Sequence, residues 1–246
     1  TLPLIQALKT RYPKAELHLF TRAGVDSLFT AQRELASVRP FAKRGAQKSL
    51  LAAARLGNEL ATEGFDLWIS PHKSIRSALI ARAVGAPVRI GYDQPWFNWL
   101  AYTHLVARRF EELDEVERLM QLVLPLEIPP TPPKVRLDLP ESARAQAAEI
   151  FSTFPADTPI LGIHPGSTWP TKCWPVEHFA QVAQTALSHG LCVALFAGPG
   201  EEHLAAKIKQ HCAYSNGLKT LAGKLPLPAV AAALPLLSAY LTNDSG

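Results

Sequence analysis

Cysteine is scarce in this 246-residue sequence. Its three copies, Cys173, Cys192 and Cys212, stand about twenty residues apart with no CxxC pair, which argues against a disulfide framework or a zinc site and favours a reducing compartment. No apolar run reaches the roughly 18–20 residues that a membrane-spanning helix needs. The opening segment, TLPLIQALKTRYPKAE, becomes charged too early for a secretory signal.

Several easily recognised catalytic motifs are also missing. The eight histidines show no HExxH spacing, so we expect no metal. The sequence contains neither a GxxxxGK[ST] loop nor a GxGxxG fingerprint, which makes a nicotinamide oxidoreductase a distant alternative and predicts no cofactor. A GxSxG nucleophile elbow is absent as well.

Positive charge is concentrated in the first half of the chain. Residues 1–135 contain 18 Lys and Arg against 13 Asp and Glu, whereas residues 136–246 contain 7 against 8. Two windows have no acid at all, and they hold Arg39, Lys43, Arg44, Lys48 and Arg55, and Lys73, Arg76, Arg82 and Arg89. Such a field predicts an anionic partner, although a solvated helix face gives the same pattern. The windows lack interleaved aromatic residues, so we expect no nucleic acid.

Helical and strand-like segments alternate along the chain. We expect helices over residues 46–62, 74–84, 141–151, 174–190, 200–211 and 227–238, with Ser74 and Gly85 capping the second. Strands are expected at 15–22, 65–70, 87–92, 159–164, 191–198 and 239–242. Residues 128–140 contain five prolines and resemble a linker. The pattern predicts an α/β protein with two doubly wound domains, 1–130 and 131–246.

The strongest local signal is the loop HPGSTWPTKCWPVEHF at residues 164–179, between an apolar strand and an amphipathic helix. Its backbone N–H groups, its hydroxyls and one mobile cation favour a phosphate or diphosphate, because helix N-termini also attract negative charge. A plain structural loop is the alternative. The candidate ligands are Ser167, Thr168, Thr171 and Lys172.

Three further turns follow strands or precede helices in the second half. LFAGPGEEH places Glu201 and Glu202 after two glycines, where either acid is suited to ribose hydroxyls or simply to a helix N-terminus. LTNDSG offers Asp244 as a ligand for sugar hydroxyls, although turns favour the same residue types. LAGKLP offers Gly223 and Lys224 to a phosphate, or forms an exposed turn.

Taken in order, these segments resemble the ADP-heptose:lipopolysaccharide heptosyltransferases of glycosyltransferase family 9. TLPLIQALKTRYP is similar to the family's first helix, and FDLWISPHKSIRSALIARAVGAPVRIGY to its acceptor-side segment. HPGSTWPTKCWP, LFAGPGE, LAGK and NDSG form the donor-side series. The tryptophan-proline form of the loop looks most like the second heptosyltransferase.

The resemblance implies a GT-B fold with two Rossmann-like domains facing a cleft, truncated at both ends. It implies a metal-independent, inverting transfer of heptose from ADP-heptose to the lipopolysaccharide inner core, in a Gram-negative cytoplasm at the inner membrane. Ser167, Thr168, Thr171 and Lys172 would bind the diphosphate, with Lys172 catalytic. Glu201 or Glu202 would meet the ribose and Asp244 the heptose, while Lys43, Arg44, Lys73 and Arg76 would meet the acceptor. The family's general base, an Asp, would precede Thr1.

Two rival functions stay open. One is a GT-B transferase that uses a UDP- or GDP-sugar, because the base pocket cannot be identified from one sequence. The other is a binding protein for a nucleotide or sugar phosphate without catalysis.

Overall fold

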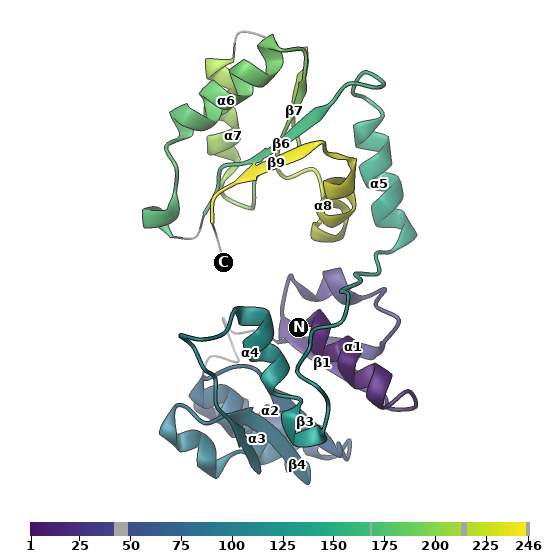
Figure 1. The fold of residues 1–246 in the computed structure, drawn as a ribbon, viewed down its shortest axis with the longest axis vertical. Coiled ribbons are helices and arrows are strands. Elements are labelled where there is room, and N and C mark those ends of the chain that lie inside the picture. Colours follow the sequence, from purple (N-terminus) through teal and green to yellow (C-terminus); the bar gives the residue numbers. More distant parts are fainter. Residues whose placement is uncertain (42–48, 168, 213–215, 245–246) are drawn as a thin grey trace. The chain divides into compact units, whose positions relative to one another are not determined.

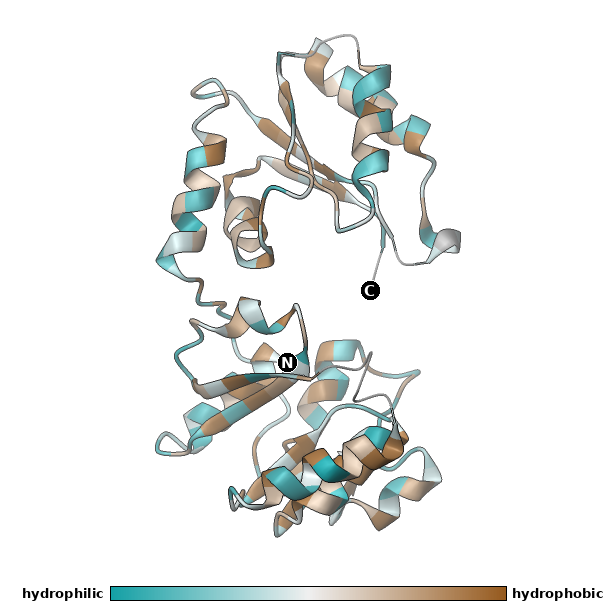
Figure 2. Ribbon diagram, turned by 180° about the vertical axis from the view of Figure 1, so that it is seen from behind, coloured by the Kyte–Doolittle hydropathy of each residue, from teal (hydrophilic) through white to brown (hydrophobic). Residues whose placement is uncertain are grey.

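The computed structural model describes residues 1–41, 49–167, 169–212 and 216–244. It contains two compact units, residues 1–138 and 139–246, which we call unit 1 and unit 2. Each unit combines parallel strands with helices (Figure 1). The strands are mostly hydrophobic and the helices mixed, as expected for buried sheets under amphipathic helices (Figure 2). None of the helices in the described part of the chain is long and apolar enough to cross a bilayer.

Unit 1 is built on parallel strand pairs, β1 with β2, and β3 with β4 and β5. Its elements in chain order are α1 (Leu2–Arg11), β1 (Leu17–Arg22), η1 (Asp26–Phe29), β2 (Leu35–Phe41), α2 (Leu50–Ala61), β3 (Leu67–Ser70), α3 (Ile75–Val84), β4 (Val88–Tyr92), η2 (Trp96–Leu100), β5 (His104–Val106), α4 (Glu115–Gln121) and η3 (Leu124–Leu126).

The strands of unit 1 have a hydrophobic core on each face. Leu67 and Ile69 of β3 pack with α1 and α4, whereas Trp68 between them packs with α2 and α3. This alternation is the period of two that a strand covered on both faces requires. The predicted caps of α3 are confirmed, since Ser74 Oγ accepts a hydrogen bond from Ser77 N at 3.2 Å and Gly85 adopts φ +69°.

Most of the proline-rich segment 128–140 belongs to unit 1. Gln6 Nε2 donates to the carbonyl of Arg136 at 2.7 Å, and Asp138 N donates to Gln32 Oε1 at 3.1 Å. Arg33 Nε donates to the Asp138 carboxylate at 2.9 Å, and this bond lowers the pKa of that carboxyl. Unit 1 therefore extends to Asp138, against residue 130 in the division predicted from sequence.

Unit 2 contains one four-stranded parallel sheet in the order β8-β7-β6-β9. Its elements are α5 (Glu141–Phe151), β6 (Ile160–His164), η4 (Pro170–Lys172), α6 (Val176–Ser188), β7 (Cys192–Leu195), α7 (Glu202–His211), β8 (Leu218–Thr220), α8 (Leu227–Ala233), η5 (Leu234–Leu236) and β9 (Ala239–Thr242). Helices α6 and α7 cover one face, and α5 and α8 the other (Figure 1).

Strand β7 shows why this sheet is buried on both sides. Val193 and Leu195 belong to the core under α6 and α7, whereas Cys192 and Ala194 belong to the core under α5 and α8. All four side chains are at most 3% exposed. Cys192 is thus a small buried hydrophobe, and its burial raises the pKa of the thiol.

Strands β2, β5 and β8 were not expected from the sequence. Strand β2 contains Pro40, and a central strand rarely tolerates proline. Strand β2 is an edge strand, because among the described strands it pairs with β1 alone, so the missing N–H of Pro40 can face the unpaired side. Strands β5 and β8 are three residues long, too short to show a clear alternation.

Candidate functional site

The strand order of unit 2 contains a topological switch point between β6 and β9. The chain proceeds from β6 to β7 to β8 and then returns to pair β9 on the other side of β6. The residues that follow β6 and β9 at their carboxyl ends are therefore neighbours, and such switch points are where open α/β sheets bind ligands. The predicted diphosphate loop leaves β6, and the NDSG turn leaves β9.

Two predicted donor ligands meet at this point. Lys172, at the end of η4, donates from Nζ to Asp244 Oδ2 at 2.8 Å. The residues are 72 apart in sequence, so the strand order brings them together. Both side chains stay accessible, at 41% exposure for Lys172 and 84% for Asp244. An ion pair this exposed contributes little to stability, so both charges are available to a ligand.

Asn243 fixes the geometry of these two loops. Its side chain is buried, its Nδ2 donates to the carbonyl of Pro165 at 2.7 Å, and its Oδ1 accepts from Trp174 N at 2.9 Å. One amide thus joins the end of β9 to both ends of the diphosphate loop. The sequence placed Asn243 in the NDSG cluster without giving it a role; its position directly after a strand was the available signal.

Glu201 lies at the neighbouring strand end, after β7. Its carboxylate accepts from Gly198 N at 3.1 Å and lies 3.4 Å from His164 Nε2 at the end of β6. A Cβ at Gly166 would overlap this carboxyl group, which explains glycine there. Of the two predicted glutamates, Glu201 is at the sheet edge. Glu202 is the exposed first residue of α7, where its charge complements the helix dipole.

The other donor-side candidates are more dispersed. Ser167 Oγ accepts from Trp169 N at 3.3 Å within the loop, and Thr171 is exposed in η4. Gly223, with φ +67°, and the exposed Lys224 follow β8, which β7 separates from β6. They share the carboxyl edge of the sheet but not the switch point. Thr168 lies outside the described residues.

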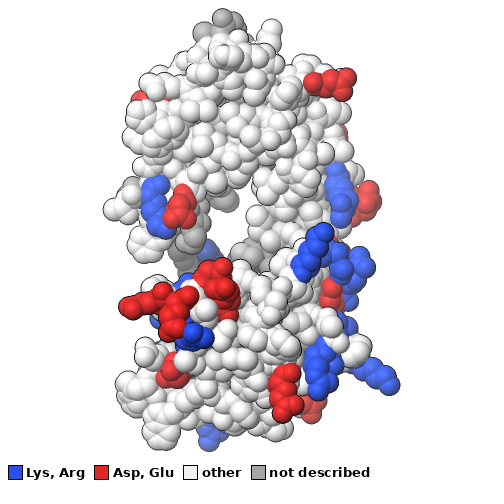
Figure 3. Space-filling model, viewed as in Figure 1, with Lys and Arg blue, Asp and Glu red and all other residues white. Residues whose placement is uncertain are grey.

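The acceptor-side candidates are only partly described. Lys73 and Arg76 lie between the carboxyl end of β3 and the first turn of α3. Lys73 is exposed and Arg76 partly buried. Lys43 and Arg44 lie outside the described residues. In the view of Figure 3, charged side chains are denser over unit 1 than over unit 2.

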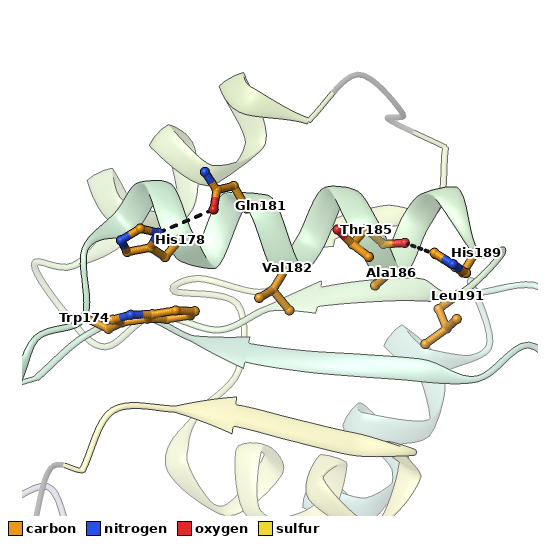
Figure 4. A pocket seen from close by; sticks show the side chains of 8 residues that line it. All are labelled: Trp174, His178, Gln181, Val182, Thr185, Ala186, His189 and Leu191. Atoms are coloured by element: carbon orange, nitrogen blue, oxygen red, sulfur yellow. Dashed lines mark hydrogen bonds between the residues drawn. The ribbon is translucent and has the colours of Figure 1, made fainter.

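A groove of about 610 Å³ runs along α6, and its lining includes none of the predicted phosphate ligands (Figure 4). Trp174, Val182 and Leu191 give it an apolar lining, and the Trp174 ring stacks on His178 with centroids 5.2 Å apart. Trp174 also packs edge-on against the buried Phe179. Trp174 therefore anchors the end of the diphosphate loop on α6.

The described residues offer no group of three or more His, Cys, Asp or Glu side chains that could hold a metal ion. The cation at the switch point is the ammonium group of Lys172.

Comparison with known proteins identifies the family of this chain. Residues 53–246 match the model of glycosyltransferase family 9 (heptosyltransferase). Lipopolysaccharide heptosyltransferase 2 of Salmonella typhimurium is 26% identical over 99% of this chain and 72% of that protein. A family 9 glycosyl transferase from Veillonella parvula superposes with a TM-score of 0.88 at 21% identity, over 100% of this chain and 71% of that one. The ADP-heptose lps heptosyltransferase II of E. coli superposes with a TM-score of 0.78 at 23% identity, over 99% and 74%. The family match, with two α/β units of the GT-B kind, shows that this chain belongs to glycosyltransferase family 9 and is a glycosyltransferase.

Proposed function

We propose that this enzyme transfers heptose from ADP-L-glycero-D-manno-heptose to the inner core of lipopolysaccharide. The observation that carries the proposal is the 2.8 Å contact between Lys172 and Asp244 at the switch point of unit 2. The Salmonella typhimurium and E. coli relatives are named as lipopolysaccharide heptosyltransferases, which supports it.

The reaction is a single inverting displacement. An acceptor hydroxyl forms a bond to the anomeric carbon while the bond from that carbon to the ADP oxygen breaks, and the hydroxyl proton leaves to a base. Negative charge builds on the departing diphosphate. Lys172 would leave Asp244 and bind that diphosphate, where a fixed cation stabilises the transition state without a metal ion.

The remaining donor ligands fit a nucleotide laid across the carboxyl edge of the sheet. Neighbouring strands lie about 4.8 Å apart, so the ends of β9, β6, β7 and β8 present successive positions. Asp244 would bind the heptose hydroxyls, and Ser167, Thr168, Thr171 and Lys172 the diphosphate. Glu201 would reach the ribose, and Gly223 and Lys224 would lie nearest the nucleoside. Glu202 would act on the dipole of α7 rather than on the ligand.

Unit 1 would bind the acceptor. The inner core carries carboxylates and phosphates, which suit Lys43, Arg44, Lys73 and Arg76. Because that acceptor is anchored in lipid, the enzyme would work in the cytoplasm at the surface of the inner membrane. Nucleic acid has no part in this function, and no cofactor is needed.

The test measures ADP release by the full chain with ADP-heptose and truncated lipopolysaccharide inner core as acceptor. Lys172→Ala should lower kcat/KM at least about tenfold, or 1.4 kcal/mol, and weaken ADP binding. Asp244→Asn should lower turnover while ADP binding stays the same or becomes tighter, because Lys172 loses its competing anion. The matched control is Lys207→Ala, at an exposed lysine on α7.

The rival functions predict different results. Turnover of a UDP- or GDP-sugar in preference to ADP-heptose would show that the proposed donor is wrong and that the enzyme uses the other nucleotide sugar. Binding of a nucleotide without turnover of any nucleotide sugar would favour a non-catalytic receptor. For the acceptor, Lys73→Glu should raise the acceptor KM and leave the donor KM unchanged; equal effects would contradict the assignment of the acceptor to unit 1.

A further inference from the structure

The 3-10 helix η2 of unit 1 divides its side chains between core and solvent. Phe97 packs with Ala78 and Ala81 of α3, and Asn98 is fully buried. The other three side chains point outward, although all are apolar: Trp96 is 73% exposed, Trp99 61% and Leu100 54%. We call these three residues the aromatic surface. Large apolar side chains grouped on a short, ordered segment mark an interaction site more often than scattered ones do.

The aromatic surface is held in place from beneath. Asn98 Nδ2 donates to the carbonyls of Tyr92 at 2.9 Å and Gln94 at 3.1 Å, which ties η2 to the end of β4. Directly after η2, Ala101 and Tyr102 are buried against α3. The exposure of the two indoles is therefore a feature of a fixed backbone, since the chain on both sides is packed.

The stretch of sequence that holds the aromatic surface is rich in basic residues. Residues 67–110, which include α3, η2 and β5, contain one acid, Asp93. The same stretch contains six basic residues: Lys73, Arg76, Arg82, Arg89, Arg108 and Arg109. Arg108 and Arg109 form ion pairs with Glu115 and Glu112, so the positive charge rests on the other four. Helix α3, against which η2 packs, carries Arg76 and Arg82 and no acid. Tryptophan favours the boundary between water and lipid, and basic residues favour anionic headgroups.

We propose that the aromatic surface is where this protein lies on an anionic lipid bilayer, with Trp96 and Trp99 at headgroup level and Leu100 against the acyl chains. A second copy of the chain is the less favourable occupant, because it would bring an equally cationic surface into contact. The proposal deepens the proposed function by naming the surface that reaches a lipid-anchored acceptor, and lipid binding itself requires neither donor nor acceptor.

The experiment measures sedimentation of the full chain with vesicles of phosphatidylethanolamine and phosphatidylglycerol that contain no lipopolysaccharide. The wild type should bind these vesicles, bind pure phosphatidylcholine less, and lose affinity as salt is raised. The double variant W96S/W99S should bind at least about tenfold more weakly, because two interfacial side chains are lost. Its thermal midpoint should stay close to that of the wild type, since both side chains are mostly exposed.

The matched control is Trp169→Ser in unit 2, which removes an indole that is 58% exposed and should leave vesicle binding unchanged. Equal binding by the wild type and W96S/W99S overturns the proposal, as does equal loss in the control. A change of oligomeric state in sedimentation velocity, without a change in vesicle binding, would assign the surface to a second copy. Because the vesicles hold no acceptor, loss of transfer activity alone would count against the proposed function and not against this surface.

Discussion

Asn243 in unit 2 and Asn98 in unit 1 are both buried, and each donates from Nδ2 to two backbone carbonyls at the carboxyl end of a strand. Asn243 joins the loops at the switch point, beside Lys172 and Asp244. Asn98 instead fixes η2, which presents Trp96 and Trp99. A buried asparagine amide thus holds a polar candidate ligand site in one unit and an apolar surface in the other.

The difference follows from where each asparagine lies in its sheet. In unit 2 the chain reverses direction across the sheet at β6 and β9, so the residues that follow these two strands meet. In unit 1, Asn98 lies in the connection from β4 to β5, which runs outside the sheet over α3. In both units the buried amide fixes the conformation of a loop. The position of that loop in the sheet topology decides which side chains it exposes.

The largest expected effect comes from replacing these two asparagines. Asn243→Leu and Asn98→Leu each leave buried backbone groups without a partner, at a cost of about 1–3 kcal/mol per group in the free energy of unfolding. Both variants should therefore be clearly destabilised in urea. Asn243→Leu alone should also weaken ADP binding, measured by calorimetry at a temperature where both variants are folded.

Vesicle binding provides the reverse comparison. Asn98→Leu should reduce binding to anionic vesicles, and Asn243→Leu should not. If both variants lost ADP binding and vesicle binding together, the two asparagines would report general stability rather than separate surfaces.

A smaller effect is expected at the contact between Gly166 and Glu201. Gly166→Ala places a methyl group against the Glu201 carboxyl, so that carboxylate must leave Gly198 N and His164. Because the displaced atoms end a flexible side chain, the cost in stability should be about 1–2 kcal/mol. In an E201A background the same Gly166→Ala change should cost much less, since the collision is gone.

This double-mutant cycle is measured by urea unfolding and by ADP binding. Additive losses would mean that the Cβ is accommodated without moving Glu201. A non-additive loss in ADP binding would link the position of the carboxylate to the nucleotide, as the proposed ribose contact requires.

The sequence predicted the fold class of both units because strands covered on both faces give continuous apolar runs. In LCVALFAG every side chain enters a core on one face or the other. It also predicted Lys172 and Asp244 as ligands, because each follows a strand of a parallel sheet. The strand order, and with it the meeting of these two residues, depends on pairings between β6 and β9 that no local pattern specifies.

The sequence left open the choice between Glu201 and Glu202, and it did not indicate the aromatic surface. Glu201 and Glu202 are adjacent and chemically identical, and only the start of α7 separates their environments. In PWFNWL, Phe97 and Asn98 face inward while Trp96 and Trp99 face outward. The sequence does not indicate this division, because a five-residue 3-10 helix is too short to show a periodic pattern.

The smallest expected effect concerns Asp138, which ends unit 1. The Arg33 hydrogen bond lowers the pKa of Asp138 below its ordinary value of 3.8. The folded state therefore binds the proton less readily than the unfolded state, and the stabilisation is present above the ordinary pKa and lost as the pH falls through the lower, folded pKa.

Asp138→Asn should reduce the free energy of unfolding by less than about 1 kcal/mol at neutral pH, because Arg33 is largely exposed. Urea unfolding of both proteins across the acid range should show this difference shrinking below about pH 4. A difference that persists in acid would mean that the destabilisation does not come from the lost Asp138 charge. No difference at neutral pH would mean that the backbone bonds of Arg136 and Asp138 to Gln6 and Gln32 are sufficient to hold this segment on unit 1.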